Sequence, residues 1–221
     1  TLLKETQDKL TQSQKMEAIG LMAGGVAHDL NNILSGIVAY PDLLERKLPE
    51  ESELVKIVRE IKLSGMRAAD VVADLLTVAR GVAAKHEVTD INQLVLDFLN
   101  SPECKNILSK FEEITIEHSL DPDVSYILCS AIHIRKCLMN LFINAAEAID
   151  GSGIITISTR DVIKEQKYVE ITIVDTGSGI TETDISQIFE PFYSKKVMGR
   201  SGTGLGLTIV WNTIQEHGGL I

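Results

Sequence analysis

The sequence predicts two domains of different fold class, an all-α helical hairpin followed by an α+β sandwich. In residues 1–84, apolar side chains recur at alternating spacings of three and four residues, which is typical of helices that pack on other helices. Beyond residue 85, β-branched stretches alternate with helix-like stretches, an order that favours one layer of sheet and one of helices. We therefore expect a hairpin domain over 1–84, a linker over 85–91 and an α/β-sandwich domain over 92–221.

A long first helix is predicted by one apolar seam that begins near the start of the chain. Leu48-Pro49-Glu50 ends it, because proline cannot continue a helix. The seam residues are Ile19, Met22, Val26, Leu30, Ile33, Ile37, Tyr40 and Leu44, with Leu3 and Leu10 continuing the pattern upstream.

A second seam follows the break and predicts a second helix. Its members are Leu54, Val58, Ile61, Gly65, Ala68, Val72, Leu75 and Ala79. Two helices joined by a short turn form an antiparallel hairpin, which leaves its apolar stripe half covered. A second copy completes a four-helix bundle, so we expect a homodimer through residues 1–84.

The second domain is predicted to mix helices and strands. We expect helices over 91–100 and 130–149, capped by Asp90 and Ser130, and a last helix after Gly206 that ends at Gly218-Gly219. Strands are expected at 114–119, 125–128, 154–160 and 168–175, the last two as a hairpin.

Charge and cysteine content exclude several classes of protein. With 21 Lys+Arg against 31 Asp+Glu, the net charge of −10 disfavours binding to nucleic acid through its phosphates. Three cysteines without a CxxC motif indicate reduced thiols. No apolar run approaches about 18 residues, so we expect no membrane contact within this segment.

Three segments of the second domain carry candidate binding residues. In the first, at 140–148, Asn140, Asn144 and Glu147 are spaced to share one helical face. Two amides on one face are suited to ligating Mg²⁺ or holding phosphate oxygens, whereas a solvated face is the simpler explanation for this segment alone.

The second segment, 175–180, places Asp175, Gly177 and Gly179 directly after an apolar strand. A carboxylate there can accept a hydrogen bond from an exocyclic amine of a base. The third, at 202–207, is Gly202-Thr203-Gly204-Leu205-Gly206-Leu207 before an apolar helix, where unpaired backbone N–H groups favour an anion. It is not a Walker A loop, because no Lys-Ser/Thr pair follows. Upstream, Lys195 and Lys196 are candidates for facing phosphate.

The three segments, together with the stretch 189–196 before the third, resemble in this order the N, G1, F and G2 boxes of the ATP-binding domain of sensor histidine kinases, which has a Bergerat-type fold. The resemblance implies ATP and Mg²⁺ as cofactors. It implies that Asn144 holds Mg²⁺ with help from Asn140 and that Asp175 binds the adenine amine beside Gly177 and Gly179. It further implies that Gly202, Gly204 and Gly206 cradle phosphates and that 178–203 is a mobile lid.

The stretch 24–34, around His28, resembles the H box of the dimerisation domain in the same kinases. His28 lies two residues past the seam position Val26, about 200° around the helix, so it is predicted to point outward. The resemblance implies that His28 takes the γ-phosphoryl group and that Asp29 assists as acid-base residue. Asn32 matches the position that orients water in members with phosphatase activity.

The same resemblance implies a cytoplasmic kinase core, in a full-length protein that is either soluble or membrane-anchored. A response-regulator aspartate is the expected acceptor and an upstream, PAS-type sensor module the expected neighbour. The family continues with two more strands, so we expect the chain to be a piece of a longer protein. Two alternatives stay open, a phosphatase-dominant or inactive nucleotide-binding scaffold and a conformational ATPase like gyrase.

Overall fold

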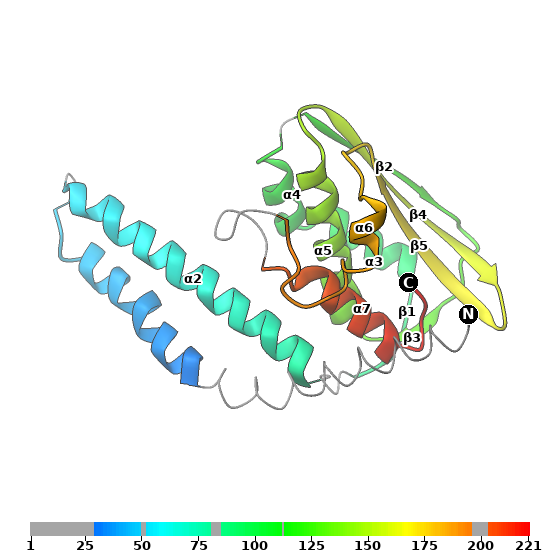
Figure 1. Ribbon diagram of the computed structural model, residues 1–221, viewed down its shortest axis with the longest axis horizontal. Coiled ribbons are helices and arrows are strands. Elements are labelled where there is room, and N and C mark those ends of the chain that lie inside the picture. Colours follow the sequence, from blue (N-terminus) through cyan, green and yellow to red (C-terminus); the bar gives the residue numbers. More distant parts are fainter. Residues whose placement is uncertain (1–28, 50–51, 81–84, 112, 196–202) are drawn as a thin grey trace. The chain divides into compact units, whose positions relative to one another are not determined.

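The computed structural model describes residues 29–49, 52–80, 85–111, 113–195 and 203–221 (Figure 1). The chain divides into two compact units, Thr1–Val82 and Ala83–Ile221. Each unit has its own core, as expected for the two predicted domains, and each is described by itself below.

The described part of the first unit is an antiparallel pair of helices, over residues 29–45 and Glu53–Arg80 (α2). Leu34 and Val72 are buried between the two helices, with Leu30 and Leu76 packed against them. The helices approach closely at Gly65, where an added Cβ would lie 2.8 Å from the Ile37 side chain. This approach explains a glycine within a helix, where it otherwise costs about 1 kcal/mol relative to alanine.

The residues buried within the hairpin differ from the predicted seam of the first helix. Leu34 and Pro41 are buried, whereas the seam residues Ile33 and Tyr40 are 62% and 66% exposed. The helix therefore carries two neighbouring apolar stripes, one covered by α2 and one open to solvent. A period of three and four residues fits both stripes, so the pattern alone does not distinguish them.

The exposed stripe includes Ile37 and Leu44 and borders a groove of about 300 Å³. The groove is completed from α2 by Val58 and Ile61. One continuous apolar surface thus extends over both helices of the hairpin.

Two helices of the second unit begin at the predicted caps. Asp90 accepts from the backbone N–H of Gln93 at the start of α3 (Ile91–Leu99), and Ser130 accepts from His133 N–H at the start of α5 (Ala131–Ala148). The remaining helices are α4 (Pro102–Leu108), α6 (Glu182–Ile185) and α7 (Gly206–Glu216). At the end of α7, Gly218 adopts a φ of 66°, which terminates the helix where the sequence predicts.

The strands form two sheets. A three-stranded sheet has the order β2 (Ile114–Leu120), β4 (Gly153–Ile163), β5 (Lys167–Asp175), with β2 and β4 parallel and β4 and β5 antiparallel. Helices α3 and α5 cover one face of this sheet (Figure 1). The core between the layers includes Ile155 and Ile157 of β4 and the edge-to-face pair Phe98 and Phe142, whose ring centroids are 5.5 Å apart.

One strand of the second sheet lies within the expected linker. Residues 85–91 contain strand β1 (Glu87–Thr89), which pairs antiparallel with β3 (Ile127–Cys129), and Ile91 is fully buried in the core. This segment therefore belongs to the fold of the second unit. A three-residue strand is too short to show the period-two pattern from which strands are predicted.

Candidate functional site

The first candidate surface is one face of α5. Asn140, Asn144 and Glu147 are all partly buried there, while Leu138 and Phe142 of the same helix are in the core. Among the described side chains, Asn140 has a fully buried amide nitrogen, Nδ2, without a hydrogen-bond partner. A buried donor left unpaired costs about 1–3 kcal/mol, so this position favours a ligand that brings an acceptor.

The start of α7 adjoins this face. A Cβ added to Gly206 would lie 3.5 Å from Asn140 Oδ1, so the first turn of α7 lies directly beside the Asn140 amide. Leu205 is fully buried, and its backbone N–H donates to Thr203 Oγ1 at 3.2 Å. The first and third predicted segments are thus brought together, although they begin 62 positions apart in the chain, at residues 140 and 202.

Gly204 is held by a close backbone contact. Its φ of 69° is left-handed, its carbonyl accepts from Phe192 N–H at 3.0 Å, and an added Cβ would lie 2.6 Å from the Phe192 carbonyl carbon. Phe192 has a φ of 64°, the one positive φ of a non-glycine residue in the described part of the chain. The segment that carries Phe192 is therefore fixed to the glycine-rich turn before α7.

The second predicted segment packs on the end of α5. Gly177 touches the Ala148 carbonyl so closely that an added Cβ would lie 2.5 Å from its oxygen, and Ser178 N–H donates to that oxygen at 3.0 Å. Asp175 Oδ1 accepts from Gly177 N–H at 2.9 Å, which orients the carboxylate at the end of β5. Gly179 follows with a φ of 73° and open space around it.

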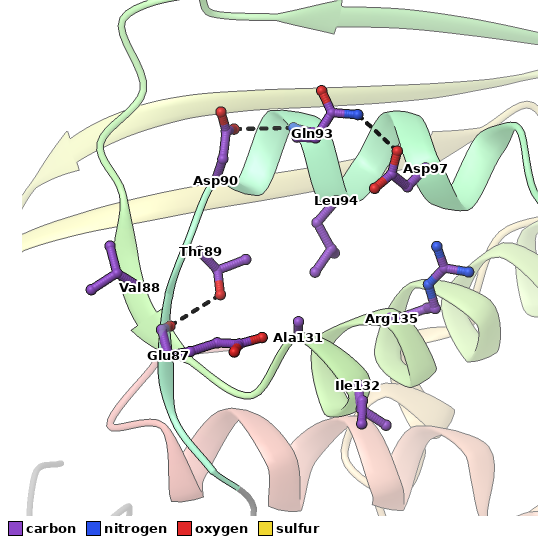
Figure 2. Close-up of a pocket in the computed structure, with 10 residues that line it drawn as sticks. All are labelled: Glu87, Val88, Thr89, Asp90, Gln93, Leu94, Asp97, Ala131, Ile132 and Arg135. Carbon is purple, nitrogen blue, oxygen red and sulfur yellow. Dashed lines mark hydrogen bonds between the residues drawn. The ribbon is translucent and has the colours of Figure 1, made fainter.

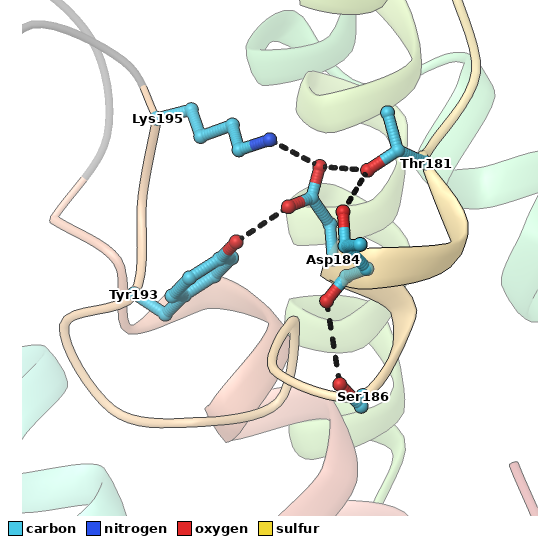
Figure 3. Close-up of polar contacts among 6 residues, drawn as sticks. Thr181, Asp184, Ser186, Tyr193 and Lys195 are labelled. Carbon is cyan, nitrogen blue, oxygen red and sulfur yellow. Dashed lines mark hydrogen bonds and ion pairs between the residues drawn. The ribbon is translucent and has the colours of Figure 1, made fainter.

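The residues after the second segment form a polar cluster that the sequence reasoning missed (Figure 3). The Asp184 carboxylate accepts from Tyr193 Oη at 2.7 Å, from Thr181 Oγ1 at 2.6 Å and from Lys195 Nζ at 2.6 Å. The Lys195 ammonium, with both hydroxyls, lowers the pKa of Asp184 to about 2. The same contacts raise the pKa values of Tyr193 and Lys195.

The Asp184 cluster changes the expectation for Lys195. Its ammonium is ion-paired with Asp184 here, so facing a phosphate requires that this pair be exchanged. A signal for the cluster was present in the Thr181-Glu182-Thr183-Asp184 spacing, which matches a capping box. Here the Thr181 hydroxyl bonds to the Asp184 carboxylate, and the Asp184 backbone N–H donates to the Thr181 carbonyl.

Other predicted residues lie elsewhere. His28, Lys196 and Gly202 are outside the described residues. Asp29 and Asn32 lie on exposed positions of the helix over 29–45, in the first unit, and so belong to a different unit from the three segments.

A separate cavity of about 360 Å³ opens between β1, α3 and the start of α5 (Figure 2). Glu87, Asp90 and Asp97 contribute carboxylates to its lining and Arg135 one guanidinium. The carboxylates outnumber the guanidinium, and their negative charge disfavours a phosphate ligand. Its lining does not include Asn140 or Gly206, so the cavity is distinct from the surface that these two residues form.

The described residues lack two further features, a metal-binding cluster and a membrane-spanning helix. No group of three or more His, Cys, Asp and Glu side chains is arranged to hold a metal ion in this part of the chain. None of the helices described here has the length and apolar content that crossing a bilayer requires.

Two family models match the chain. Residues 18–84 match the His Kinase A (phospho-acceptor) domain, and residues 129–221 match the histidine kinase-, DNA gyrase B- and HSP90-like ATPase domain. The first match contains His28, Asp29 and Asn32, and the second contains all three segments of the candidate nucleotide surface.

Similar proteins agree with these matches. Sensor kinase CckA of Brucella abortus (strain 2308) is 33% identical over 99% of this chain and 24% of its own length. The full-length structure of ShkA in complex with AMPPNP has a TM-score of 0.72 at 24% identity, covering 89% of this chain and 41% of that one. The complex of histidine kinase ThkA with response regulator TrrA gives a TM-score of 0.62 at 21% identity, covering 99% and 61%.

The chain spans between about a quarter and a half of the length of the curated relatives it matches. Residues 18–84, which match the phospho-acceptor domain, lie almost entirely in the hairpin unit, and residues 129–221, which match the ATPase domain, lie in the α/β unit. The chain belongs to the sensor histidine kinase family, as a core that joins these two domains.

Proposed function

We propose that this chain binds ATP on its second unit and transfers the γ-phosphoryl group to His28, from which a response-regulator aspartate receives it. The observation that carries the proposal is the junction of α5 and α7, where a buried, unpaired amide donor of Asn140 lies beside Gly206. A phosphate oxygen of ATP supplies the acceptor that this donor lacks.

The nucleotide is held from three sides. The free backbone N–H groups of the first turn of α7 and the positive end of its dipole attract the phosphates. The carboxylate of Asp175, oriented by Gly177 N–H, accepts from the adenine amine. Gly179 leaves room for the base, because the space around it is open, whereas Gly177 allows this segment to pack closely on Ala148.

The residues present fit a Mg²⁺ ion bound together with ATP. Asn144 lies one turn from Asn140 on α5, and its amide oxygen is a ligand of the type that Mg²⁺ takes alongside phosphate oxygens. When bound, the ion neutralises charge on the β- and γ-phosphates. Asn140 Nδ2 is a donor and is assigned to a phosphate oxygen.

The transfer needs a nucleophile and a proton acceptor on the hairpin. The unprotonated ring nitrogen of His28 attacks the γ-phosphorus, the bond to the β–γ bridging oxygen breaks, and ADP leaves. Asp29 takes the proton from the other ring nitrogen. In the second transfer, an aspartate oxygen of the regulator attacks the same phosphorus and the P–N bond breaks. Asp29 returns its proton to the ring, which restores neutral imidazole.

Two partners follow from the proposal. The exposed apolar stripe and groove of the hairpin are covered by a second copy, which forms a four-helix bundle. The ThkA–TrrA complex supports a response-regulator receiver domain as the second partner. When the regulator is bound, Asn32 orients the water that removes the phosphoryl group from the regulator's aspartate. An upstream sensor module, PAS-type by resemblance, supplies the input to this cytoplasmic core.

A nucleotide-binding scaffold that does not phosphorylate itself is the second candidate. It is favoured by Glu147, whose carboxylate shares the α5 face with Asn140 and Asn144 and repels phosphate. Nucleotide binding without label on His28 would identify this alternative.

The nucleotide site is tested by calorimetric titration of the whole chain with Mg-ATP and with Mg-GTP. We expect ATP to bind and GTP to bind at least about tenfold more weakly, because Asp175 recognises an amine. Asp175→Asn is expected to weaken ATP binding by about tenfold or more. Glu165→Gln, on an exposed turn between β4 and β5, is the matched control. Equal affinity of ATP for wild type and Asp175→Asn contradicts the assigned base contact.

A further inference from the structure

His217, at the end of α7, joins the two helices that form the nucleotide surface. Its Nε2 accepts from the Ser130 backbone N–H at 2.9 Å, and its Nδ1 lies 2.7 Å from the Thr213 carbonyl oxygen. A carbonyl only accepts and an N–H only donates. The two partners therefore fix the neutral tautomer that carries its proton on Nδ1.

The two hydrogen bonds of His217 act on different parts of the fold. The Thr213 carbonyl belongs to α7 itself, four residues earlier, so this bond only orients the ring. Ser130 is the N-cap of α5, so the other bond connects the end of α7 to the start of α5. The ring also lies against His86, with centroids 4.7 Å apart.

The helices α5 and α7 contact each other at three positions, and residues later in α5 contact residues earlier in α7. Ser130 meets His217, Cys137 is hydrogen-bonded by the buried Thr213, and Asn140 lies beside Gly206. The helices are therefore antiparallel. His217 closes one end of their contact and the nucleotide surface lies at the other, about 15 Å away at 1.5 Å per residue.

The hydrogen bond in the middle of this contact, between Thr213 and Cys137, is weaker than the one at His217. Cys137 is a small, buried thiol, and burial raises its pKa to about 11, so it is neutral and bonds weakly. Gly206 has no side chain with which to hold Asn140. A backbone N–H held by a ring nitrogen fixes both the distance and the axial position of one helix on the other.

We propose that His217 is a positioning residue that sets the register of α7 on α5, and so the distance between the Asn140 and Asn144 amides and the phosphate-binding turn at Gly204–Gly206. This inference rests on the proposed ATP site. Loss of the Ser130 bond lets α7 shift along α5, so that the amides and the N–H groups no longer reach the same phosphates together.

Two substitutions separate the two bonds of the imidazole. In His217→Gln, the amide oxygen takes the place of Nε2 and keeps the bond to Ser130 N–H. In His217→Asn, the amide nitrogen takes the place of Nδ1, which keeps the bond to Thr213 and loses the one to Ser130. His217→Ala loses both, and His118→Ala, on an exposed position of β2, is the control.

The experiment titrates Mg-ATP into each variant of the whole chain by calorimetry, well below its melting temperature. We expect Kd to rise about fivefold to tenfold in His217→Asn and His217→Ala, as for one lost hydrogen bond, and to stay within about twofold in His217→Gln. The binding stoichiometry is expected to remain that of wild type.

Three outcomes overturn the inference. They are an unchanged Kd in His217→Asn, a Kd in His217→Gln as weak as in His217→Ala, and a reduced stoichiometry at unchanged Kd. The last indicates that His217 only maintains the folded fraction. A wild-type chain that fails to bind ATP contradicts the proposed function itself, and the inference with it.

Discussion

Lys195 Nζ lies 2.6 Å from Asp184 Oδ2, in the segment between the second and third candidate nucleotide-binding segments. The same carboxylate accepts from Tyr193 Oη, so Asp184 connects α6 to the loop that precedes the Gly204 turn. In the proposed ATP complex, a phosphate competes with Asp184 for the Lys195 ammonium. The Lys195 ammonium is thus already paired with the Asp184 carboxylate in the structure.

The first prediction concerns the ionisation of Tyr193. Its hydroxyl donates to the Asp184 carboxylate, which raises its pKa above the ordinary value of about 10. A raised pKa means that the bond is fully present at neutral pH and is lost as pH rises through the folded-state value. In Asp184→Asn we expect the pKa of Tyr193 to fall toward its ordinary value.

NMR titration of protein labelled in tyrosine measures this pKa, with the Tyr193 signal assigned by its loss in Tyr193→Phe. Tyr126, which is exposed and distant from Tyr193 in the sequence, serves as the internal control. An identical Tyr193 titration in wild type and Asp184→Asn contradicts the described contact.

The second prediction compares two glycines with the same backbone conformation. In Gly204→Ala the added Cβ meets the Phe192 backbone at 2.6–2.9 Å, in addition to the strain of a φ of 69°. We expect a loss of about 2–4 kcal/mol of stability and weaker ATP binding. Gly151 has a φ of 78° and open space around it, so Gly151→Ala should lose only about 1–2 kcal/mol.

Denaturant unfolding and ATP titration of both variants measure the difference. Because Gly151 lies outside the candidate site, Gly151→Ala should keep the wild-type ATP affinity. If the two variants lose equal stability and bind ATP equally well, the close contact between Gly204 and Phe192 does not exist.

The third prediction concerns the exposed apolar stripe of the hairpin. Ile37→Glu places a charge in the groove that we assign to the dimer contact, so the dimer dissociation constant should rise by about tenfold or more. Ala39→Glu adds the same charge at an exposed position that does not line the groove. Sedimentation equilibrium measures both constants, and equal constants place the dimer contact elsewhere.

The sequence predicted the elements whose signals are local. The caps Asp90 and Ser130, the β4–β5 hairpin and the glycine-rich turn before α7 are each marked by residues within a few positions of the feature itself. The three candidate nucleotide-binding segments were proposed for the same reason, from their order and residue types.

The rest depends on contacts between distant residues. Ile33 and Leu34 are both apolar, and only the packing of α2 decides that Leu34 is buried and Ile33 exposed. Strand β1 exists because β3 pairs with it, and Lys195 faces Asp184 because the chain turns back between them. The bond from His217 to Ser130 spans 87 residues, which no local pattern reveals.

The most direct test of the account is phosphorylation of the whole chain with Mg²⁺ and γ-labelled ATP, alongside His28→Ala and the exposed-position control His118→Ala. We expect acid-labile, alkali-stable label on wild type and His118→Ala. We expect none on His28→Ala, whose affinity for ATP should stay within about threefold of wild type, or about 0.65 kcal/mol. Label that persists in His28→Ala, or a wild type that binds ATP without becoming labelled, would contradict transfer to His28.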